Sequence, residues 1–573
     1  MAEIRKIKVG TASCGLAAGA GAVLDFFRDH AGVEIEEVGC IGHCYAEPLV
    51  EVVTDAGSVF YRDVKGEQAC LDNILALGET GRLEVSPSRR KYEMLKVTRL
   101  AGRICPTSFD AYVAEGGYGA LKKALTMTAA EVVDEVKRSG LRGRGGGGFP
   151  TGMKWQFLAA KQAEKKILIC NADEGDPGAF MDRSMMESVP HQVLEGMLIG
   201  AYATGADILF IYCRAEYPLA IKHIRIAIDQ IREHGLDVVN GKKLDIIIKE
   251  GAGAFVCGEE TALIASLEGR RGTPRFRPPF PTDRGWNDYP TSLNNVETFA
   301  NIPLVIGEGG AAFAQVGTEK SKGTKLFALA GDLKYPGLIE VPMGTTIGEI
   351  VFEVGGADPD QVKAVQTGGP SGGCIPKELF DTPVDYDSLN ALGAIMGSGG
   401  MIVIGTDRCM VETARYFLDF THRESCGKCT FCRVGMMRMY ETLERIVAGK
   451  GEMSDIDFLA DLGPKIKKGS LCGLGQTAPN PVLATLRYYK NEYIEHVRDK
   501  RCAALVCNAL VDVKLDPEKC VKCRLCIRNC AVGAISDDFV IDNAKCTRCN
   551  TCIDVCPKHA VARVEKGEGY YAE

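Results

Sequence analysis

The spacing of the cysteines near the carboxyl end constrains this chain more than any other feature of its sequence. Residues 515–573 contain the pattern C-x2-C-x2-C-x3-C twice, so that four thiols fall within a short stretch each time. Thiolates at this spacing ligate [4Fe–4S] cubes, and in such pairs the fourth cysteine of each copy ligates the other cube. Structural zinc is the alternative. The spacing predicts two ligand sets: Cys520, Cys523, Cys526 and Cys556; and Cys546, Cys549, Cys552 and Cys530.

A third group of cysteines lies upstream, between segments with helical periodicity. Cys426, Cys429 and Cys432 follow the spacing C-x2-C-x2-C, which suits three ligands of one further cube. A cube needs a fourth ligand, and Cys472 is the nearby candidate. Zinc is again the alternative. We therefore expect a helical iron–sulfur bundle over residues 406–495 and a ferredoxin domain of the bacterial two-cluster type over residues 515–573.

Length and composition limit the class of protein. At 573 residues the chain is too long for a single core and predicts several domains. Its net charge of −7 gives no reason to expect nucleic-acid binding. The first ten residues lack the apolar region of a signal peptide, and no apolar run of about 18 residues predicts a membrane span. We expect a cytoplasmic protein in which the closely spaced cysteines, at least 12 of the 24, serve metals rather than disulfides.

Residues 1–85 form a predicted first domain. Strand-like segments precede Cys14 and Cys40, and Cys44 follows four residues after Cys40. This pattern resembles the thioredoxin-like [2Fe–2S] ferredoxin domain, although that family has two cysteines in its first loop and this chain has only Cys14. Cys70 is a fourth ligand only if the fold brings it near. The alternative is a vestigial domain whose thiols serve docking. Residues 86–126 are expected to be a linker and lead-in.

Strand and helix patterns alternate over residues 127–324, which indicates an α/β domain. Ligands of such folds bind at the carboxyl ends of the strands. Three candidate ligand loops fall at such places, at residues 143–154, 171–178 and 251–260. Glycine lets backbone amides approach a phosphate closely, and the glycine-rich first loop is bracketed by the cations Arg144 and Lys154.

Five motifs together make a specific resemblance: GRGGGGFPTGMKW, NADEGDPG, GAGAFVCGEETAL, PPFPTDRGW and NNVET. Over roughly residues 90–490 the chain resembles the flavin-bearing, NADH-oxidising subunit of respiratory NADH dehydrogenase and its soluble relatives. The resemblance implies a Rossmann-like domain over residues 127–324 that binds FMN, with NAD(H) stacked on the flavin. Two positions depart from the common pattern, since Gly147 stands where alanine is usual and Phe255 where tyrosine is usual.

The resemblance also implies roles for individual residues. Glu174 is the one residue to which we assign a catalytic role. Glutamates near a ribose favour NAD over NADP, although none is assigned to the 2′-hydroxyl and NADP stays open. The cofactor-binding residues that the motifs imply are Gly143, Arg144, Gly145 and Lys154; Asn171, Asp173, Glu174 and Gly175; Gly253, Phe255, Glu259 and Glu260; and Asn294, Asn295 and Thr298.

Two further segments complete the layout. Residues 325–405 suggest a β-grasp domain of the soluble-ligand-binding type, and its loop QTGGPSGGC is expected to be a tight turn that packs against the cluster domain. Residues 496–514 form a predicted connector in which His496, Cys502 and Cys507 are candidate ligands of zinc or a small cluster, with no fourth ligand evident. We interpret the remaining cysteines as small buried apolar residues: Cys70, Cys105, Cys170, Cys213, Cys257, Cys374 and Cys409.

The complete layout, with a cysteine-bearing first domain and a fused ferredoxin domain, resembles the flavin subunit of soluble, often electron-bifurcating, NAD(P)-dependent [FeFe]-hydrogenases. It implies FMN, NAD(H), three [4Fe–4S] cubes, a candidate [2Fe–2S] cluster and a candidate zinc ion. The implied partners are a hydrogenase catalytic subunit, a small thioredoxin-like [2Fe–2S] subunit and soluble ferredoxin. Alternatives are the flavin subunit of an NAD-dependent formate dehydrogenase, that of an NADH:quinone oxidoreductase, and an electron-transfer scaffold with an idle nucleotide site.

Overall fold

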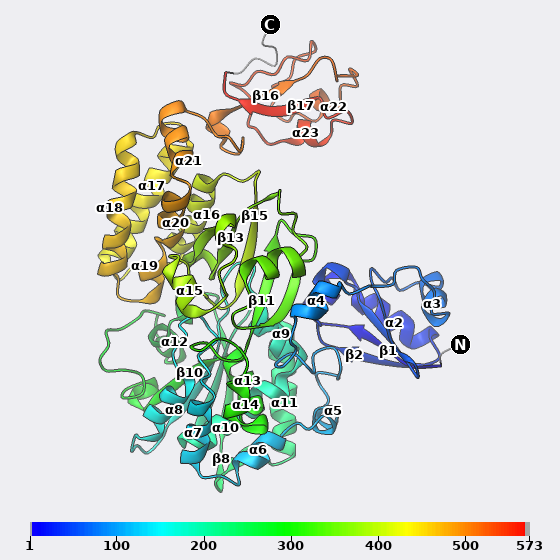
Figure 1. Cartoon of the computed structure of the whole chain (residues 1–573), viewed down its shortest axis with the longest axis vertical. Coiled ribbons are helices and arrows are strands. Elements are labelled where there is room, and N and C mark those ends of the chain that lie inside the picture. Colours follow the sequence, from blue (N-terminus) through cyan, green and yellow to red (C-terminus); the bar gives the residue numbers. More distant parts are fainter. Residues whose placement is uncertain (1–2, 568–573) are drawn as a thin grey trace. The chain divides into compact units, whose positions relative to one another are not determined.

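The computed structural model of the chain describes residues 3–567. The chain divides into two compact units, and each is described by itself (Figure 1). The first comprises Met1–Ile404 and Leu471–Leu474, and the second comprises Gly405–Ser470 and Gly475–Glu573. No helix among the described residues combines the length and the apolar character needed to cross a membrane.

The amino-terminal part of the first unit is a four-stranded sheet in the order β2-β1-β3-β4, drawn in blue in Figure 1. β1 and β2 run parallel, whereas β3 is antiparallel to both β1 and β4. Apolar residues of β1 and β3, such as Ile7 and Val52, are fully buried against α2 and α3. The elements are β1 (Ile4–Gly10), α1 (Ser13–Ala18), α2 (Ala20–His30), β2 (Glu34–Val38), β3 (Val50–Thr54), β4 (Gly57–Tyr61) and α3 (Gln68–Leu75).

The lead-in segment, expected to be linker-like, contains three short helices: α4 (Pro87–Tyr92), α5 (Phe109–Ala114) and α6 (Gly119–Ala124). Tyr112 and Tyr118 are buried in the core of the following domain. The Tyr112 hydroxyl and the Tyr118 backbone N–H donate to the buried carboxylate of Glu195. These hydrogen bonds take the place of water around the carboxylate. The segment is therefore built into the first unit along most of its length.

A parallel sheet in the order β10-β5-β6-β9 forms the centre of the next domain. β5 and β6 are almost continuously buried, as expected for parallel strands covered on both faces. The strands are β5 (Ile167–Ala172), β6 (Ile208–Arg214), β9 (Asp245–Gly251) and β10 (Thr291–Asn295), with a small hairpin of β7 (Val238–Val239) and β8 (Lys242–Lys243). The helices are α7 (Ala129–Arg138), α8 (Thr151–Ala159), α9 (Met181–Ser188), α10 (Pro190–Thr204), α11 (Pro218–Glu233), α12 (Glu260–Leu267), α13 (Val296–Glu308) and α14 (Gly310–Phe313).

A second sheet of the first unit has five strands in the order β12-β11-β15-β13-β14. β11 runs antiparallel to β12 and parallel to β15, so the sheet is mixed. Its apolar face forms a core of its own. The elements are β11 (Thr324–Gly331), β12 (Gly337–Pro342), β13 (Val362–Thr367), β14 (Gly373–Pro376), α15 (Tyr386–Ala391) and β15 (Gly400–Gly405).

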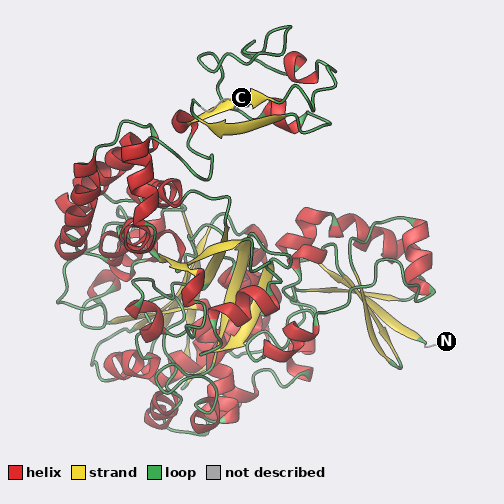
Figure 2. Ribbon diagram, turned by 45° about the horizontal axis from the view of Figure 1, so that its top comes forward, coloured by secondary structure: helices red, strands yellow, loops and turns green. Residues whose placement is uncertain are grey.

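The second unit begins with a helical bundle and ends in a small fold built largely of loops, as Figure 2 shows. The bundle helices are α16 (Met410–Arg423), α17 (Met436–Val447), α18 (Met453–Gly469), α20 (Asn480–Tyr488) and α21 (Lys490–Ile494), and α19 (Gly473–Thr477) precedes α20. The final segment pairs β16 (Val511–Leu515) with β17 (Val561–Glu565) in antiparallel register and adds α22 (Leu525–Arg528) and α23 (Thr551–Asp554).

Candidate functional site

The glycine loop joins α7 to α8, so the expectation that it follows a strand was wrong. The Gly143 N–H donates to the Phe149 carbonyl at 2.9 Å, which closes the loop on itself. Gly146 and Gly148 have φ of +114° and +60°, in the left-handed region that favours glycine. A Cβ on Gly145 would lie 2.9 Å from the Cβ of Asn295, whereas one on Gly147 would meet nothing within 4 Å. The space at Gly147 therefore also suits the alanine that is usual there.

Arg144 is fully buried, and its side chain holds the glycine loop by hydrogen bonds inside the protein. Its guanidinium donates to the carbonyls of Arg142 and Lys322, and its Nε lies 3.9 Å from the Glu297 carboxylate. Its backbone N–H donates to the Thr298 hydroxyl at 2.8 Å. The side chain that was predicted to hold a phosphate is thus engaged by the protein itself.

The two neighbouring glutamates of the third loop, residues 251–260, make different contacts. Glu259 caps α12, since one carboxylate oxygen accepts from the Thr261 and Ala262 backbone N–H groups. Glu260 pairs instead with Lys154 at 3.3 Å and with Arg277 at 2.6 Å. Burial alone would raise the pKa of Glu260, but these two cations outweigh it and lower that pKa.

The acidic loop begins where β5 ends. The Asn171 side chain donates to the Gly258 carbonyl at 3.0 Å and so ties this loop to the third loop. The carboxylate of Asp173 lies 3.9 Å from the Arg214 guanidinium. Glu174, the predicted catalytic residue, is buried, and its two oxygens accept from the backbone N–H groups of Asp182 and Arg183 at the start of α9. Burial raises the pKa of Glu174, against these hydrogen bonds.

Phe255 approaches the acidic loop at a glycine. A Cβ on Gly175 would lie 2.7 Å from the Phe255 ring and 2.6 Å from the Arg214 guanidinium, so no larger residue fits there. Gly253 has φ of +80°, and a Cβ on it would lie 2.4 Å from the Glu216 carboxylate. Both predicted glycines therefore lie in close contact with neighbouring side chains, and the positive φ of Gly253 also favours glycine.

The end of β10 supplies the remaining predicted residues. Residues 294–295 pair in register with residues 170–171 of β5, which places three asparagines at adjoining strand ends. The Asn294 amide oxygen accepts from the Trp155 indole N–H at 2.9 Å. Asn295 caps α13 by accepting from the Thr298 N–H at 3.3 Å, and its amide donates to Asp182. The three loops and this strand end thus form one site.

The carboxyl group of Asp176 is a feature of this site that was not predicted from the sequence. The surrounding protein raises the pKa of Asp176 to about 7, against the hydrogen bond that the Ser398 hydroxyl donates at 3.0 Å. The tight turn at residues 368–372 packs against it, since a Cβ on Gly369 would lie 2.3 Å from Oδ1. This contact within the first unit was not predicted either. In the sequence, the only indication of this contact was the glycines of the QTGGPSGGC motif, which allow close approach of the backbone.

A cleft of about 840 Å³ opens beside the glycine loop. Three partly exposed aromatic rings face the region: Phe149 from the loop, Phe157 from α8 and Phe280 from the segment before β10. Lys154, Glu260 and Arg277 line the same cleft. Lys154 and Glu260 were predicted from the sequence, but the aromatic residues were not. Their only signal in the sequence was the presence of phenylalanines in and around the glycine loop and the PPFPTDRGW motif.

The three cysteines of the first domain form a connected group. Cys40 and Cys44 have their sulfur atoms 3.9 Å apart, and the Cys14 thiol is hydrogen-bonded to Cys44. Cys44 and the Arg183 guanidinium, 3.8 Å from the Cys14 sulfur, lower the pKa of Cys14 to about 7. Cys70 packs instead against the core of the domain from α3, so it is not a fourth member of this group.

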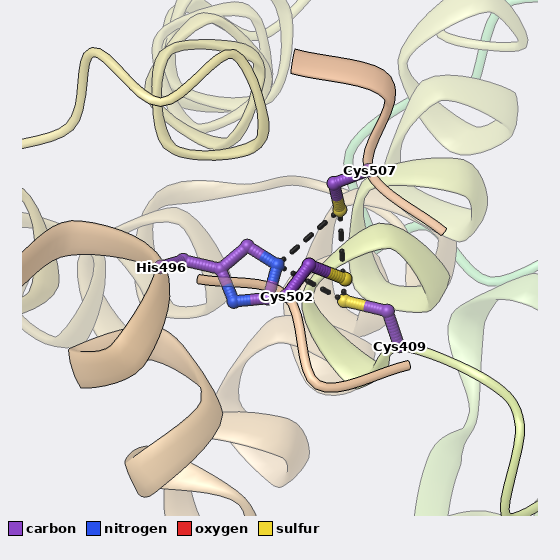
Figure 3. Close-up of side chains that lie close together, drawn as sticks. All are labelled: Cys409, His496, Cys502 and Cys507. Atoms are coloured by element: carbon purple, nitrogen blue, oxygen red, sulfur yellow. Dashed lines mark hydrogen bonds between the residues drawn. The ribbon is translucent and has the colours of Figure 1, made fainter. Parts of the chain in front are cut away.

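The second unit contains a compact set of four ligand atoms, drawn in Figure 3. The sulfurs of Cys409, Cys502 and Cys507 and a ring nitrogen of His496 lie within 4.8 Å of one another, and all four residues are buried. His496 Nε2 lies 3.3 Å from the Cys409 sulfur and 3.2 Å from the Cys507 sulfur. His496 Nδ1 lies 2.7 Å from the Glu492 carbonyl, the contact that commonly orients a metal-binding imidazole.

Several predictions about the cysteines were wrong. Cys409 was interpreted as a small buried apolar residue, and the connector was expected to lack an evident fourth ligand. The structure brings Cys409, at the start of α16, to the other three residues from a distant part of the sequence. Cys70 and Cys105 are only half-buried, whereas the prediction of burial is confirmed for Cys170, Cys213, Cys257 and Cys374.

The cysteines of the final segment gather around two small cavities. One is lined by Cys520, Cys523, Cys526 and Cys556, and the other by Cys530, Cys546, Cys549 and Cys552. The structure therefore groups them in the crossed manner that their spacing predicts, and each cavity presents the four sulfurs that a cube requires.

In the bundle, Cys426 and Cys429 precede Cys432, whose sulfur lies 3.2 Å from the Ser425 hydroxyl. Cys472 belongs to the short segment Leu471–Leu474 of the first unit.

Comparison with protein families supports this division of the chain. Residues 136–304 match the "Nuo51 FMN-binding domain". Residues 412–496 match the "NADH-ubiquinone oxidoreductase-F iron-sulfur binding region", and residues 539–562 match a "4Fe-4S binding domain". These matches cover the glycine loop, the bundle cysteines and the second cysteine quartet.

Curated relatives extend the similarity over most of the chain. The NADP-reducing hydrogenase subunit HndC of Solidesulfovibrio fructosivorans is 56% identical over 452 residues, covering 78% of this chain and 92% of the relative. An NADH-quinone oxidoreductase subunit of Rhizobium meliloti is 45% identical, covering 69% and 95%. A solved NAD+-reducing [NiFe]-hydrogenase in the H2-reduced state has a chain similar at a TM-score of 0.64 and 29% identity, covering 86% and 84%. The protein therefore belongs to the family of flavin subunits of NAD(P)-reducing hydrogenases and NADH-quinone oxidoreductases.

Proposed function

We propose that the chain is the NAD(H)-oxidising and NAD+-reducing flavin and iron–sulfur subunit of a soluble, cytoplasmic, multisubunit hydrogenase. One observation carries the proposal. The acidic loop and the end of β10 lie at the carboxyl ends of parallel strands, and the glycine loop lies against the end of β10 beside an aromatic-lined cleft. FMN, when bound, exchanges a hydride with the nicotinamide and single electrons with clusters.

The flavin site is shaped mainly by backbone. The glycines of residues 143–148 carry no side chains that would keep a phosphate away from the loop backbone, which is the fit expected of a nucleotide-binding loop. Arg144 positions this loop through its bonds to two carbonyls and to Thr298. Glu174 acts in the same way on the acidic loop, because both of its oxygens hold the start of α9. We infer that Arg144 and Glu174 are positioning residues.

The cleft suits the adenosine half of a nicotinamide dinucleotide. Phe149, Phe157 and Phe280 offer faces on which a base can stack, and Lys154 and Arg277 offer charge for phosphates. Glu260 lies between these cations in its ionised form and can accept hydrogen bonds from ribose hydroxyls. A carboxylate there disfavours a 2′-phosphate by charge repulsion, so we propose NAD rather than NADP as the substrate.

Electrons leave the flavin region through clusters that the cysteine sets would hold. The two sulfur-lined cavities of the final segment support two [4Fe–4S] cubes. The spacing of Cys426, Cys429 and Cys432 in the bundle supports three ligands of a third cube. The mixed sheet of residues 4–61 supports a thioredoxin-like assignment for the first domain, and its three linked thiols support a [2Fe–2S] cluster there.

The Cys409, His496, Cys502 and Cys507 group supports a structural zinc ion. Three sulfurs and one imidazole nitrogen make the Cys3His set of closed tetrahedral sites. All four ligand residues are buried, so no open position for a substrate is left. The ion would fix the connector to the start of α16, because Cys502 and Cys507 lie in the connector and Cys409 precedes that helix.

The remaining partners follow from this role. Hydrogen activation would lie in a hydrogenase catalytic subunit, with a small thioredoxin-like [2Fe–2S] subunit and soluble ferredoxin as further electron partners. The relatives named as hydrogenase subunits favour this assembly over a formate dehydrogenase. An NADH:quinone oxidoreductase is the second candidate, because several curated relatives bear that name.

Reduction of the bound flavin tests the proposal. The full-length chain, loaded with FMN and iron, should bleach at flavin wavelengths on addition of NADH and should pass electrons to ferricyanide. The Glu260→His chain should lose selectivity for NADH over NADPH, whereas Glu250→His, on the exposed end of β9, should not. A flavin-loaded chain that NADH does not bleach would overturn the proposal and favour a scaffold with an idle nucleotide site.

A further inference from the structure

The first domain contains three linked thiols where a [2Fe–2S] cluster needs four ligands. Cys14 lies at the start of α1, Cys40 follows β2, and Cys44 begins a short turn of helix at Cys44–Ala46. Cys44 contacts both other cysteines, so the three sulfurs form an arc with Cys44 in the middle. Among the described residues, only the Cys409 set has at least three ligand atoms that all lie within 4.8 Å of one another. An open arc suits the spread of a two-iron cluster better than a single ion.

Several side chains near these three sulfurs already have hydrogen-bond or packing partners. The Ser13 hydroxyl donates to Glu187 at 2.5 Å, and the Arg183 cation has no lone pair to offer. The His43 ring is turned to Tyr45, with Nδ1 lying 3.1 Å from the tyrosine hydroxyl. Cys70 packs into the domain core from α3. Each of these groups therefore has another contact or, for Arg183, no lone pair to offer.

Glu47 is placed differently. Its carboxylate lies against the loop that carries Cys14, because a Cβ on Gly15, the next residue, would lie 3.1 Å from Glu47 Oε2. A Cβ on Gly10, where β1 ends, would lie 3.6 Å from the same oxygen. The Leu49 N–H donates to that oxygen at 2.8 Å and holds the carboxylate in this direction. The carboxylate thus fills the place between β1 and α1, and Glu47 follows Cys44 by only three residues.

We propose that Glu47 is the fourth protein ligand of a [2Fe–2S] cluster held by Cys14, Cys40 and Cys44. This inference rests on the proposed role of the first domain as a cluster domain. Carboxylate oxygen is an ordinary ligand of iron in proteins. Three thiolates and one carboxylate bring four negative charges, and the Arg183 guanidinium beside Cys14 offsets part of that charge.

The chemistry of such a site differs from that of an all-cysteine cluster. One iron would have two thiolate ligands and the other a thiolate and an oxygen, so the two irons become inequivalent. Exchange of cysteine for other ligands at one iron changes the reduction potential of two-iron clusters strongly. The ligand set is therefore visible in spectra that do not depend on catalytic activity.

Iron counts and spectra of the full-length chain test the proposal. Three cubes and one two-iron cluster amount to about 14 irons, on four irons per cube. The Glu47→Gln chain should contain about 12 irons and lose the two-iron signal in reduced-state EPR and Mössbauer spectra, with its flavin and cubes retained. Glu47→Cys should keep about 14 irons and show shifted g values and more nearly equivalent irons. Glu51→Gln, on β3 in the same domain, is the matched control and should resemble the parent.

The outcomes separate this inference from the proposed function. A Glu47→Gln chain that keeps about 14 irons and the parent spectrum would overturn the role of Glu47 alone. A parent chain with about 12 irons, unchanged by Cys44→Ser, would overturn the cluster domain itself. If Glu47→Gln loses the flavin as well, the Glu47→Cys spectrum decides, and an unshifted two-iron signal there would contradict ligation by Glu47.

Discussion

The Glu187 carboxylate accepts two hydrogen bonds from Ser13, at 2.9 Å from its backbone N–H and at 2.5 Å from its hydroxyl. Glu187 belongs to α9, and the next residue, Ser188, accepts from the Cys40 N–H at 3.0 Å. The other end of α9 holds Glu174 of the acidic loop. One short helix thus joins the flavin region at its start to the cysteine-bearing domain at its end, which gives that domain a defined place in the first unit.

Loss of the Glu187 carboxylate should loosen the first domain. Glu187→Ala leaves the half-buried Ser13 N–H and hydroxyl without their acceptor, which costs up to about 1–3 kcal/mol. Backbone amides of residues 4–18 should then exchange with deuterium roughly 5- to 100-fold faster, on about 1.4 kcal/mol per tenfold change. Glu34→Ala, whose side chain is exposed on β2, should leave the exchange unchanged. Equal protection in both variants would contradict the anchoring role of α9.

The aromatic cleft makes a kinetic prediction. Phe149→Ala and Phe157→Ala should each raise the KM for NADH by about 3- to 10-fold, because base stacking on an aromatic ring contributes about 0.5–1.5 kcal/mol. The kcat should change little, since this binding is equally strong in ground and transition states. Phe276→Ala alters an exposed ring outside the cleft and serves as the control. A fall in kcat at unchanged KM would place the dinucleotide elsewhere.

The buried Cys3His set predicts one bound zinc. Cys409→Ser should reduce the zinc content of the full-length chain from about one ion to a small fraction, because a structural site needs all four ligands. Helix α16 should become more sensitive to proteolysis at its start. Cys105→Ser, at a half-buried cysteine outside any ligand set, should retain the metal. Iron instead of zinc, measured by elemental analysis, would contradict the identity of the ion, and unchanged zinc in Cys409→Ser would contradict the site.

Asp176 predicts a dependence of stability on pH. Its pKa is raised from 3.8 to about 7 in the folded chain, so between these values the folded state holds a proton that the unfolded state has lost. Stability should therefore fall as pH rises from about 4 to 7, by at most about 1.4 kcal/mol per pH unit and by less where solvent reaches the carboxyl group. Above about pH 7 this contribution should level off.

Asp176→Asn removes that titration while keeping an acceptor for Ser398. The variant should gain thermal stability over the parent progressively between about pH 5 and pH 7, because only the parent loses stability over that range. Tryptophan fluorescence is a suitable signal, because the two tryptophans of the chain, Trp155 and Trp286, both lie in the first unit. Asp360→Asn, at an exposed position, is the control. A constant difference between variant and parent across this range would contradict the shifted pKa.

Patterns formed by residues close together in the sequence were the most informative about ligand sets and loops. The two quartets at Cys520 and Cys546 were recognisable because a cube is bound by thiols a few residues apart, and the structure gathers the same sets around two cavities. The alternation of strands and helices over residues 127–324 likewise indicated where the ligand loops would lie. Parallel strands place their carboxyl ends at one edge, which explains the loops after β5 and β9 but not the glycine loop between α7 and α8.

Side-chain direction was harder to predict. Glu259 and Glu260 are adjacent, yet one caps a helix and the other pairs with Lys154 and Arg277 in the cleft. Successive residues at a helix start point in different directions, and small differences in helix phase decide which one faces a ligand. Arg144 shows the same limit, because its charge suggested a phosphate contact and its packing turned it inward.

The sequence by itself determined the family, and it predicted the order of the domains and the ligand sets whose members are close along the chain, because those features depend on spacing and local periodicity. Only the tertiary structure decided which distant residues meet. Cys409 joined His496, Cys502 and Cys507, Ser13 met Glu187, and Glu47 came to lie beside the Cys14 loop. Such meetings depend on how helices and sheets pack, and packing brings together residues that no spacing rule relates.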